Sequence, residues 1–196
     1  MASHDDTELQ ARLDFIARGR VVRRYHTCDM LDYQRIDGHS FGVAMLTTII
    51  VPVASPLRRA ALLMGGLVHD LAEHKTGDLP GPAKRELGLR EQFGAYEDAL
   101  LDRFGLMYPL DTRDARVVKL ADAAEGAYHC TVERAKGNIL AREAFKNFWS
   151  YLMELRLAPG HPGDPEIPEG LVIEDGERAL RRWLATNWME ANGGKW

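Results

Sequence analysis

The sequence predicts an all-α protein, and three observations support this prediction. Apolar residues recur at helical spacing along most of the chain, capping residues and prolines stand where these rows begin, and no stretch alternates convincingly enough for a strand. The chain has 196 residues, 45% of them hydrophobic and 28% charged, which is typical of an ordinary globular protein. One domain spanning residues 1–196 is therefore expected.

The expected helices are set by apolar rows, by caps and by breaks. Helices are predicted over residues 3–19, 39–50, 56–69, 90–104, 112–136, 139–157 and 175–192, with a single helical turn at 83–87. Pro56 suits the first turn of its helix, and Asp111 and Thr112 suit the start of theirs. Residues 158–170 are rich in Pro and Gly and predict a loop, so the chain is expected to end in a loop-and-helix extension from about residue 158.

The first three helices carry distinct apolar patterns. On the first, one stripe is formed by Leu9, Leu13 and Ile16. On the second, His39 heads a row that continues with apolar residues, so a histidine is expected to face the core. The third is almost wholly apolar over residues 60–68 and is expected to be buried.

Composition and charge argue against several classes of function. The net charge of -4 lacks the basic excess of nucleic-acid-binding proteins, so no nucleic-acid partner is expected. The longest apolar run, residues 41–54, is interrupted by polar residues and is too short to span a bilayer, and the acidic N-terminus does not resemble a signal peptide, so no membrane contact is expected. Two cysteines are too few for a disulfide framework, which suits a cytoplasmic location.

The chain is organised around residues 62–82, where the apolar helix runs into His69 and Asp70. Ionisable groups at the end of a buried segment are costly unless a partner or a metal ion takes up their charge. On a helix, His69 and Glu73 lie four residues apart and Asp70 lies three from Glu73, so the three side chains point into one sector. Taken alone, His69-Asp70 would more often be an ordinary helix-end pair than a metal site.

Two further residues favour a metal site. His39 and Asp122 stand at core-facing positions of separate helices, where each would otherwise be an unexplained buried polar group. With His69 and Asp70 they give a nitrogen and oxygen set that suits one divalent transition ion, Co²⁺, Mn²⁺, Fe²⁺, Ni²⁺ or Zn²⁺, rather than Ca²⁺. Glu73 faces the same sector without being needed as a ligand, so it is the candidate to orient or deprotonate a water. The alternative for Glu73 is a solvated helix-end carboxylate.

The order His39, His69-Asp70, Asp122 resembles the H…HD…D signature of HD-domain metal-dependent phosphohydrolases, whose fold is a helical bundle. The run HDLAEHKTGDLPGPAK is similar to the segment around the HD pair in 5′-deoxynucleotidases of this superfamily, and bacteriophage HD-type dATP triphosphohydrolases share the same frame. The resemblance covers about residues 20–134.

The resemblance also implies which residues meet a substrate. The implied substrate-binding residues are Arg24, Tyr25, Thr27, Lys84 and Lys119. The three cations among them flank the proposed metal ligands and would bind phosphate, although each taken alone would more often be a surface charge. Tyr25, where relatives have Trp, would stack on the base or the deoxyribose, or else belong to the core. Thr27 would line the base pocket. Asp78 would face the sugar or assist the leaving O5′, with a plain Asx turn as the alternative.

One departure from the family pattern lies next to a proposed ligand. Gly38 stands where many relatives have an acidic residue just before the histidine, and this would loosen the contacts around His39.

The resemblance implies a phosphohydrolase that cleaves the 5′ phosphoester of 2′-deoxynucleotides. A dNTP of the dATP type, giving deoxynucleoside and triphosphate, is slightly favoured by additional arginines near the ligands. The alternative is a dNMP, from which a 5′-nucleotidase would release phosphate. Other HD activities, such as cyclic-nucleotide or alarmone hydrolysis, and a nucleotide-binding HD module without turnover are the remaining alternatives. Relatives form dimers or larger rings, so a homo-oligomer is also expected, with Trp183, Trp188 and Trp196 in packing or subunit contacts.

Overall fold

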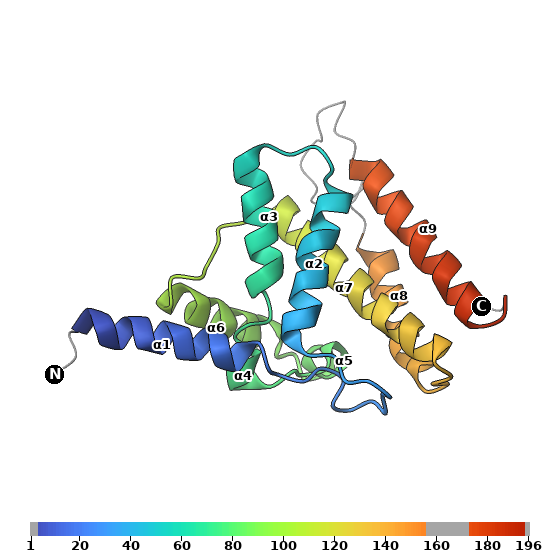
Figure 1. The fold of residues 1–196 in the computed structure, drawn as a ribbon, viewed down its shortest axis with the longest axis horizontal. Coiled ribbons are helices and arrows are strands. Elements are labelled where there is room, and N and C mark those ends of the chain that lie inside the picture. Colours follow the sequence, from blue (N-terminus) through green and yellow to red (C-terminus); the bar gives the residue numbers. More distant parts are fainter. Residues whose placement is uncertain (1–3, 156–172, 195–196) are drawn as a thin grey trace.

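The computed structural model describes residues 4–155 and 173–194, most of which are helical (Figure 1). The helices are α1 His4–Gly19, α2 Ile36–Ile50, α3 Pro56–Val68, α4 Glu73–Thr76, α5 Gly81–Glu86, α6 Arg90–Arg103, α7 Thr112–Ala135, α8 Ala141–Glu154 and α9 Ile173–Ala191. Within the two described ranges there is no strand, only an isolated bridge between Arg23 and Arg35. The all-α prediction is confirmed, and the helices lie close to their predicted positions.

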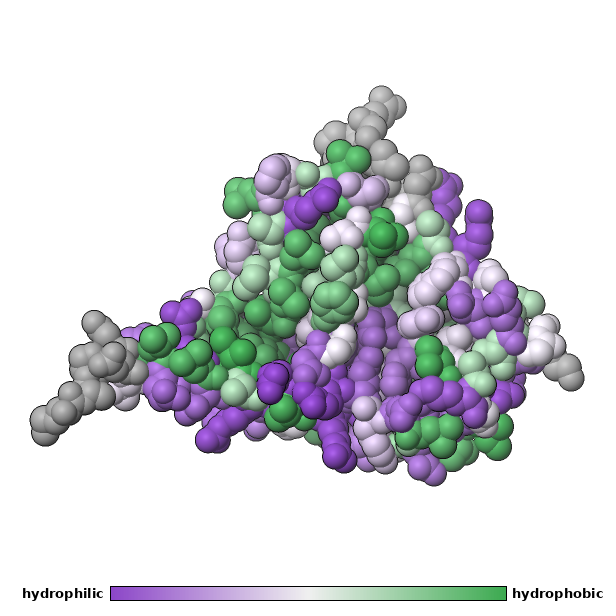
Figure 2. Space-filling view, in the orientation of Figure 1, coloured by the Kyte–Doolittle hydropathy of each residue, from purple (hydrophilic) through white to green (hydrophobic). Residues whose placement is uncertain are grey.

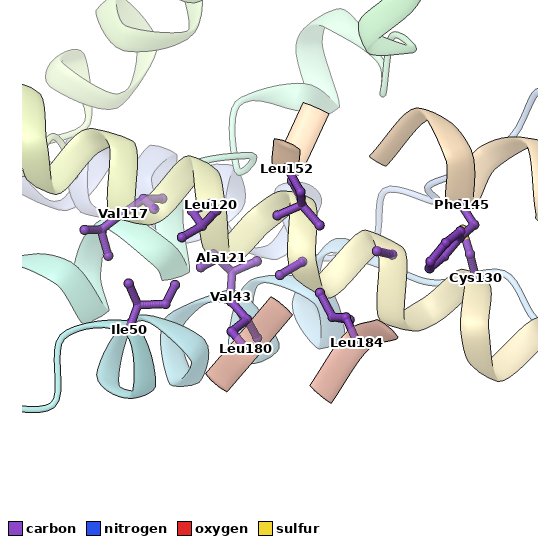
Figure 3. Close-up of a cluster of buried hydrophobic side chains, with 14 of the residues drawn as sticks. Val43, Ile50, Val117, Leu120, Ala121, Cys130, Phe145, Leu152, Leu180 and Leu184 are labelled. Atoms are coloured by element: carbon purple, nitrogen blue, oxygen red, sulfur yellow. The ribbon is translucent and has the colours of Figure 1, made fainter. Parts of the chain in front are cut away.

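Helix α7 lies at the centre of the bundle, with α2, α3, α8 and α9 packed around it (Figure 1). Small residues such as Ala121 let neighbouring helices approach α7 closely, and Figure 3 shows side chains of α2, α8 and α9 meeting along it. Val43 of α2 and Leu184 of α9 are fully buried there. Trp188 of α9 stacks on Phe145 of α8, with ring centroids 3.5 Å apart, so Trp188 serves packing.

Helix α1 turns its predicted stripe outward. Leu9, Leu13 and Ile16 are 57%, 53% and 41% exposed, and Phe15 is the apolar side chain that α1 buries. The periodicity was sufficient to place the three residues on one stripe, but α1 projects from the body of the bundle (Figure 1) and the described part of the chain leaves that stripe uncovered.

Helix α3 is buried on one side only, which corrects the prediction of a buried helix. Leu62 is 2% exposed, whereas Leu57 and Leu67 are 74% and 43% exposed. Exposed apolar side chains of α2 and of the turn after it lie next to the exposed side of α3 (Figure 2). Together the apolar face comprises Leu9, Leu13, Ile16, Phe41, Met45, Ile49, Val53, Leu57 and Leu67. Figure 2 shows apolar side chains gathered over α3, α2 and the adjoining part of α1.

Helix α2 begins at Ile36, one turn before the predicted start at His39. Ile36 is 1% exposed and its N–H donates to the carbonyl of Val22. This core contact and this backbone hydrogen bond start the helix earlier than the turn predicted at Asp37-Gly38. The predicted cap of α7 is confirmed, because the carboxylate of Asp111 accepts a hydrogen bond from the N–H of Asp114 at 2.7 Å.

Helix α3 ends at Val68, so His69 and Glu73 do not share one continuous helix as predicted. Residues 69–72 form tight turns, in which the N–H of Glu73 donates to the carbonyl of Asp70 at 3.0 Å. In turns of this kind, residues three apart lie on the same side, which keeps Asp70 and Glu73 close together.

The C-terminal predictions are only partly covered by the structure. The predicted loop at 158–170 and Trp196 lie outside the described residues. Helix α9 begins at Ile173 and ends at Ala191, and Trp183 on it is 40% exposed beside Tyr128. No helix within residues 4–155 and 173–194 has the length and apolarity needed to cross a membrane.

Candidate metal centre

Three separate segments bring the predicted ligands to one point. His39 comes from the first turns of α2, His69 and Asp70 follow the end of α3, and Asp122 comes from the middle of α7. One ligand atom of each residue lies within 4.8 Å of the other three. Five of the six distances between these atoms are 3.1–3.9 Å.

These separations suit a single ion. Nitrogen and oxygen ligands about 2 Å from a tetrahedral ion lie about 3.3 Å from one another. Two imidazoles and two carboxylates form the mixed nitrogen and oxygen set that divalent transition ions accept. The residues therefore fit such an ion in both chemistry and spacing.

Close packing of α2 on α3 makes this meeting possible. A Cβ atom on Gly66 would lie 2.7 Å from the Cα atom of Ala44, so only glycine allows α3 to approach α2 so closely. As a result, the rings of His39 and His69 lie with their centroids 5.2 Å apart. Nδ1 of His69 donates to the carbonyl of Gly66 at 2.8 Å, which leaves Nε2 to face the cluster.

His39 is completely buried and is held from behind. Its Nε2 faces the other three ligands, and its Nδ1 lies in short contact with Oε2 of Glu125. An Arg24 nitrogen also lies close to Nδ1, but a guanidinium can only donate, so the Nδ1 hydrogen is directed to the carboxylate. The expectation that Gly38 loosens the contacts around His39 is wrong, because Glu125 supplies a partner from another helix.

The cluster concentrates charge where His39 is buried and the other three residues are half-buried. Burial alone would raise the pKa values of Asp70 and Asp122, but the neighbouring imidazoles hold both below the ordinary range. Burial and Arg24 lower the pKa of His39, but hydrogen bonds to the surrounding carboxylates outweigh them and raise it to about 9. The carboxylates therefore favour positive charge at this point, as the ligands of a cation do.

Glu73 lies beside the cluster and is 6% exposed. Its Oε2 is buried without a hydrogen-bond partner among the described residues, and its Oε1 lies 3.8 Å from Nζ of Lys84. Burial, followed by the charges of Asp70 and Asp78, raises the pKa of Glu73 to about 10. These surroundings therefore favour the protonated form of Glu73.

Asp78 and Lys84 approach the cluster from the segment after α4. Oδ2 of Asp78 accepts from the backbone N–H of Tyr25 at 3.0 Å, so the turn is tied to the segment that carries Arg24. Lys84 forms a second ion pair with Glu97 of α6 at 3.4 Å, and the hydroxyl of Thr76 donates to the same carboxylate oxygen.

The remaining predicted residues lie in different surroundings. Arg24 is 7% exposed and its guanidinium lies 3.4 Å from Asp122. Tyr25 is 8% exposed, its ring stacks on His129 and its hydroxyl donates to a backbone carbonyl at 3.2 Å. Thr27 and Lys119 are exposed.

Sequence reasoning missed three residues near the centre. They are Gln34, Glu97 and Glu125. Glu125 carried a usable signal, because it follows Asp122 by three residues and therefore lies on the same side of α7. Gln34 and Glu97 carried none, since each acts across a contact between segments distant in sequence.

Comparison with known proteins bears on this geometry. Residues 17–102 match the family model of the HD domain, a range that includes His39, His69 and Asp70 and ends before Asp122. No match was found among curated protein sequences.

Two solved structures are similar over almost the whole chain. One is the HD phosphohydrolase DatZ of cyanophage S-2L, bound to dA and one catalytic Zn²⁺ ion, with 19% identity, a TM-score of 0.61 and coverage of 95% of this chain and 98% of that one. The other is an HD-domain phosphohydrolase of Listeria innocua, with 16% identity, a TM-score of 0.59 and coverage of 91% and 98%. At these identities the likeness describes the fold.

Proposed function

We propose, from the match of residues 17–102 to the HD-domain family model, that the chain is a metal-dependent phosphohydrolase that cleaves the 5′ phosphoester of 2′-deoxynucleotides. The observation that carries the proposal is the cluster of two imidazoles and two carboxylates with Glu73 buried beside it. A module that only binds nucleotides has no need of a set that activates water.

The four residues of the cluster are the proposed ligands of one divalent transition ion, with Co²⁺, Mn²⁺, Fe²⁺, Ni²⁺ and Zn²⁺ as candidates. Both imidazoles would bind through Nε2, because Nδ1 of His39 and Nδ1 of His69 are turned to other partners. When bound, such an ion polarises a phosphoryl oxygen and lowers the pKa of a water molecule.

Glu73 is the proposed base. Its Oε2, which has no hydrogen-bond partner among the described residues, lies beside the cluster and can accept a hydrogen bond from the attacking water when the carboxyl group is ionised. In the hydrolysis, the water oxygen bonds to phosphorus, the bond between phosphorus and O5′ breaks, one water proton passes to Glu73, and O5′ takes up a proton. Asp78 is proposed to contact the sugar and assist this departure.

Lys84 is the phosphate ligand with the most direct support, because its ammonium lies beside Glu73 while its side chain is 16% exposed. Arg24 is proposed to neutralise Asp122 as well as to meet phosphate, since its guanidinium already lies against that carboxylate. Lys119 and Thr27 are proposed contacts at the exposed rim. Tyr25 is proposed as a wall of the base pocket, because its ring and its hydroxyl are both held by the core.

Two substrates fit this chemistry. A dNTP of the dATP type is proposed first, and the binding of dA by DatZ is consistent with a deoxyadenosine substrate. A dNMP is the alternative, since the same bond would be broken with release of phosphate rather than triphosphate.

The deciding experiment incubates the purified protein with Co²⁺ or Mn²⁺ and a panel of dNMPs, dNDPs and dNTPs. We expect release of deoxynucleoside, with the inorganic product identifying the substrate. Binding of a nucleotide without any release would favour the nucleotide-binding module. If no member of the panel yields deoxynucleoside, the proposed activity is wrong.

We also propose that copies of the chain assemble through the apolar face defined above. Its nine side chains are 41–74% exposed, which amounts to roughly the 800 Å² per partner that a stable dimer buries. A second copy would cover the stripe of α1 that its own bundle leaves open. Light scattering is expected to give a dimer or larger assembly for the wild type and a smaller species for Ile49→Glu. A wild type that stays monomeric at high concentration would rule this interface out.

A further inference from the structure

Glu125 stands on α7 one turn after Asp122 and points toward the back of the metal centre. Its side chain is 12% exposed. Oε2 meets Nδ1 of His39 and lies 3.5 Å from the guanidinium of Arg24, while Oε1 accepts from the amide of Gln34 at 2.6 Å. Both carboxylate oxygens therefore have donors from protein side chains.

The geometry of His39 leaves one arrangement of its ring hydrogen. Nε2 faces the cluster and must carry a free lone pair to bind an ion, so the hydrogen of the neutral ring is on Nδ1. Of the groups near Nδ1, only the carboxylate of Glu125 can accept it. A carboxylate at that position fixes the ring orientation and makes the opposite nitrogen a better ligand.

A second observation, independent of the hydrogen bond, comes from α2. A Cβ atom on Gly42 would lie 2.8 Å from Cγ of Glu125. Gly42 is three residues after His39, on the same side of α2. The missing side chain is what allows Glu125 to reach past α2 to the ring.

Arg24 and Gln34 complete the arrangement. A buried carboxylate is costly unless it is paired and hydrogen-bonded. Arg24 supplies the compensating charge to Glu125 and Asp122 together, and it also donates to Gln34 at 2.9 Å. Gln34 can therefore accept from Arg24 with its oxygen and donate to Glu125 with its nitrogen, which fixes the position of the carboxylate.

We propose that Glu125 is a positioning residue that locks the ring of His39 with Nε2 toward the ion, and that Gly42 provides the space it needs. This inference rests on the proposed metal centre but does not depend on which substrate is cleaved. The ring of His69 is set differently, by a backbone carbonyl, so the two imidazoles are held by separate means.

The test measures divalent-ion affinity without substrate, by competition with a chelator, for wild type, Glu125→Ala, Glu125→Gln and Gly42→Ala. We expect Glu125→Ala to weaken binding about 10- to 100-fold, the range for residues that orient a metal ligand. Glu125→Gln should weaken it less, because the amide oxygen can still accept from Nδ1. Gly42→Ala should weaken it although the carboxylate is retained, because the new methyl group displaces that carboxylate.

Two further readouts separate positioning from general destabilisation. The visible absorption spectrum of bound Co²⁺ should change in the Glu125 variants, because the His39 ligand moves. Glu143→Gln removes the same charge from an exposed position on α8 and should bind the ion like the wild type. Circular dichroism of the metal-free variants checks the fold, and Glu125→Gln, which conserves volume, decides the case if Glu125→Ala does not fold.

The outcomes distinguish this proposal from the proposed function. Unchanged affinity and an unchanged Co²⁺ spectrum in Glu125→Gln and Gly42→Ala would overturn the positioning role while leaving the metal centre intact. A wild type that binds no divalent ion would instead contradict the metal centre itself.

Discussion

The two sides of the candidate site are built in opposite ways. The packed wall, formed by α2, α3 and α7, holds His39 with no exposed surface and gives both its ring nitrogens partners. The arm, residues 73–89 with the short helices α4 and α5, leaves Oε2 of Glu73 unpartnered and shares Lys84 between two carboxylates. The wall is therefore preorganised for an ion, whereas the arm keeps polar groups that a substrate can engage.

The glycines of the two sides differ in the same sense. In the packed wall, a Cβ atom on Gly66 would lie 2.7 Å from the backbone of Ala44. In the arm, a Cβ atom on Gly77 or Gly81 would meet nothing within 4 Å, and Gly77 has a φ of 76°, which directs the chain out of α4. Glycine serves close packing on one side and chain direction on the other.

The largest expected effect comes from breaking the packed wall at a ligand. Asp122→Asn conserves volume but replaces a carboxylate with a neutral amide. We expect ion affinity and the rate of hydrolysis each to fall by more than the 10- to 100-fold typical of changing a residue that only orients a ligand. Elemental analysis and deoxynucleoside release measure the two losses. Asp98→Asn, at an exposed position of α6, is the matched control and should behave like the wild type. Full metal content in Asp122→Asn would contradict the ligand assignment.

The arm should respond differently. Glu73→Gln removes the proposed base, so we expect hydrolysis to fall about 10²- to 10⁴-fold. Its affinity for the ion should stay close to that of the wild type, because Glu73 is not one of the four proposed ligands. Chelator competition and turnover are measured on the same preparation, with Glu86→Gln on the exposed side of α5 as control. If Glu73→Gln loses the ion as Asp122→Asn does, the arm is not independent of the wall.

The same contrast explains which features of the fold and of the site the sequence predicts. Apolar rows located the helices, and the burial they implied is what made His39 and Asp122 conspicuous. Periodicity identifies which residues share a face but not whether another element covers it, so Leu9, Leu13 and Ile16 were placed on one stripe without any indication that it faces outward.

The surroundings of the ligands were harder to predict. Contacts such as that of Gln34 with Glu125 join residues 91 positions apart, and no local pattern encodes them. Arg24 was recognised only through resemblance, and no local pattern indicated that its guanidinium lies against Asp122.

The glycine contrast gives a test of stability. Gly66→Ala should lower the free energy of unfolding by about 1–3 kcal/mol, because the methyl group meets backbone that cannot move aside. Gly81→Ala, in the first turn of α5, should change it by less than about 0.5 kcal/mol, since the added methyl group meets open space. Urea unfolding of both variants measures the difference. Equal effects would show that the wall is no more tightly packed than the arm.

The smallest expected effect concerns Glu133, which fastens the loop after Tyr25 to α7. Its side chain is fully buried and accepts from the N–H groups of Leu31 at 2.6 Å and Asp32 at 3.1 Å and from the amide of Asn138 at 3.0 Å. Burial would raise the pKa of Glu133, but these hydrogen bonds lower it below its ordinary value of 4.5.

A carboxylate whose pKa is lowered by folding stabilises the protein above its unfolded-state pKa, and this contribution is lost as the pH falls through the folded-state value. Glu133→Gln cannot satisfy all three donors, so at neutral pH it should lower the free energy of unfolding by about 1 kcal/mol. The difference from the wild type should begin to shrink below pH 4.5 and be smallest below the lowered folded-state pKa, where the wild-type side chain is neutral as well. Urea unfolding at a series of pH values measures this convergence. A difference that is the same at every pH would mean that Glu133 acts through its shape rather than its charge.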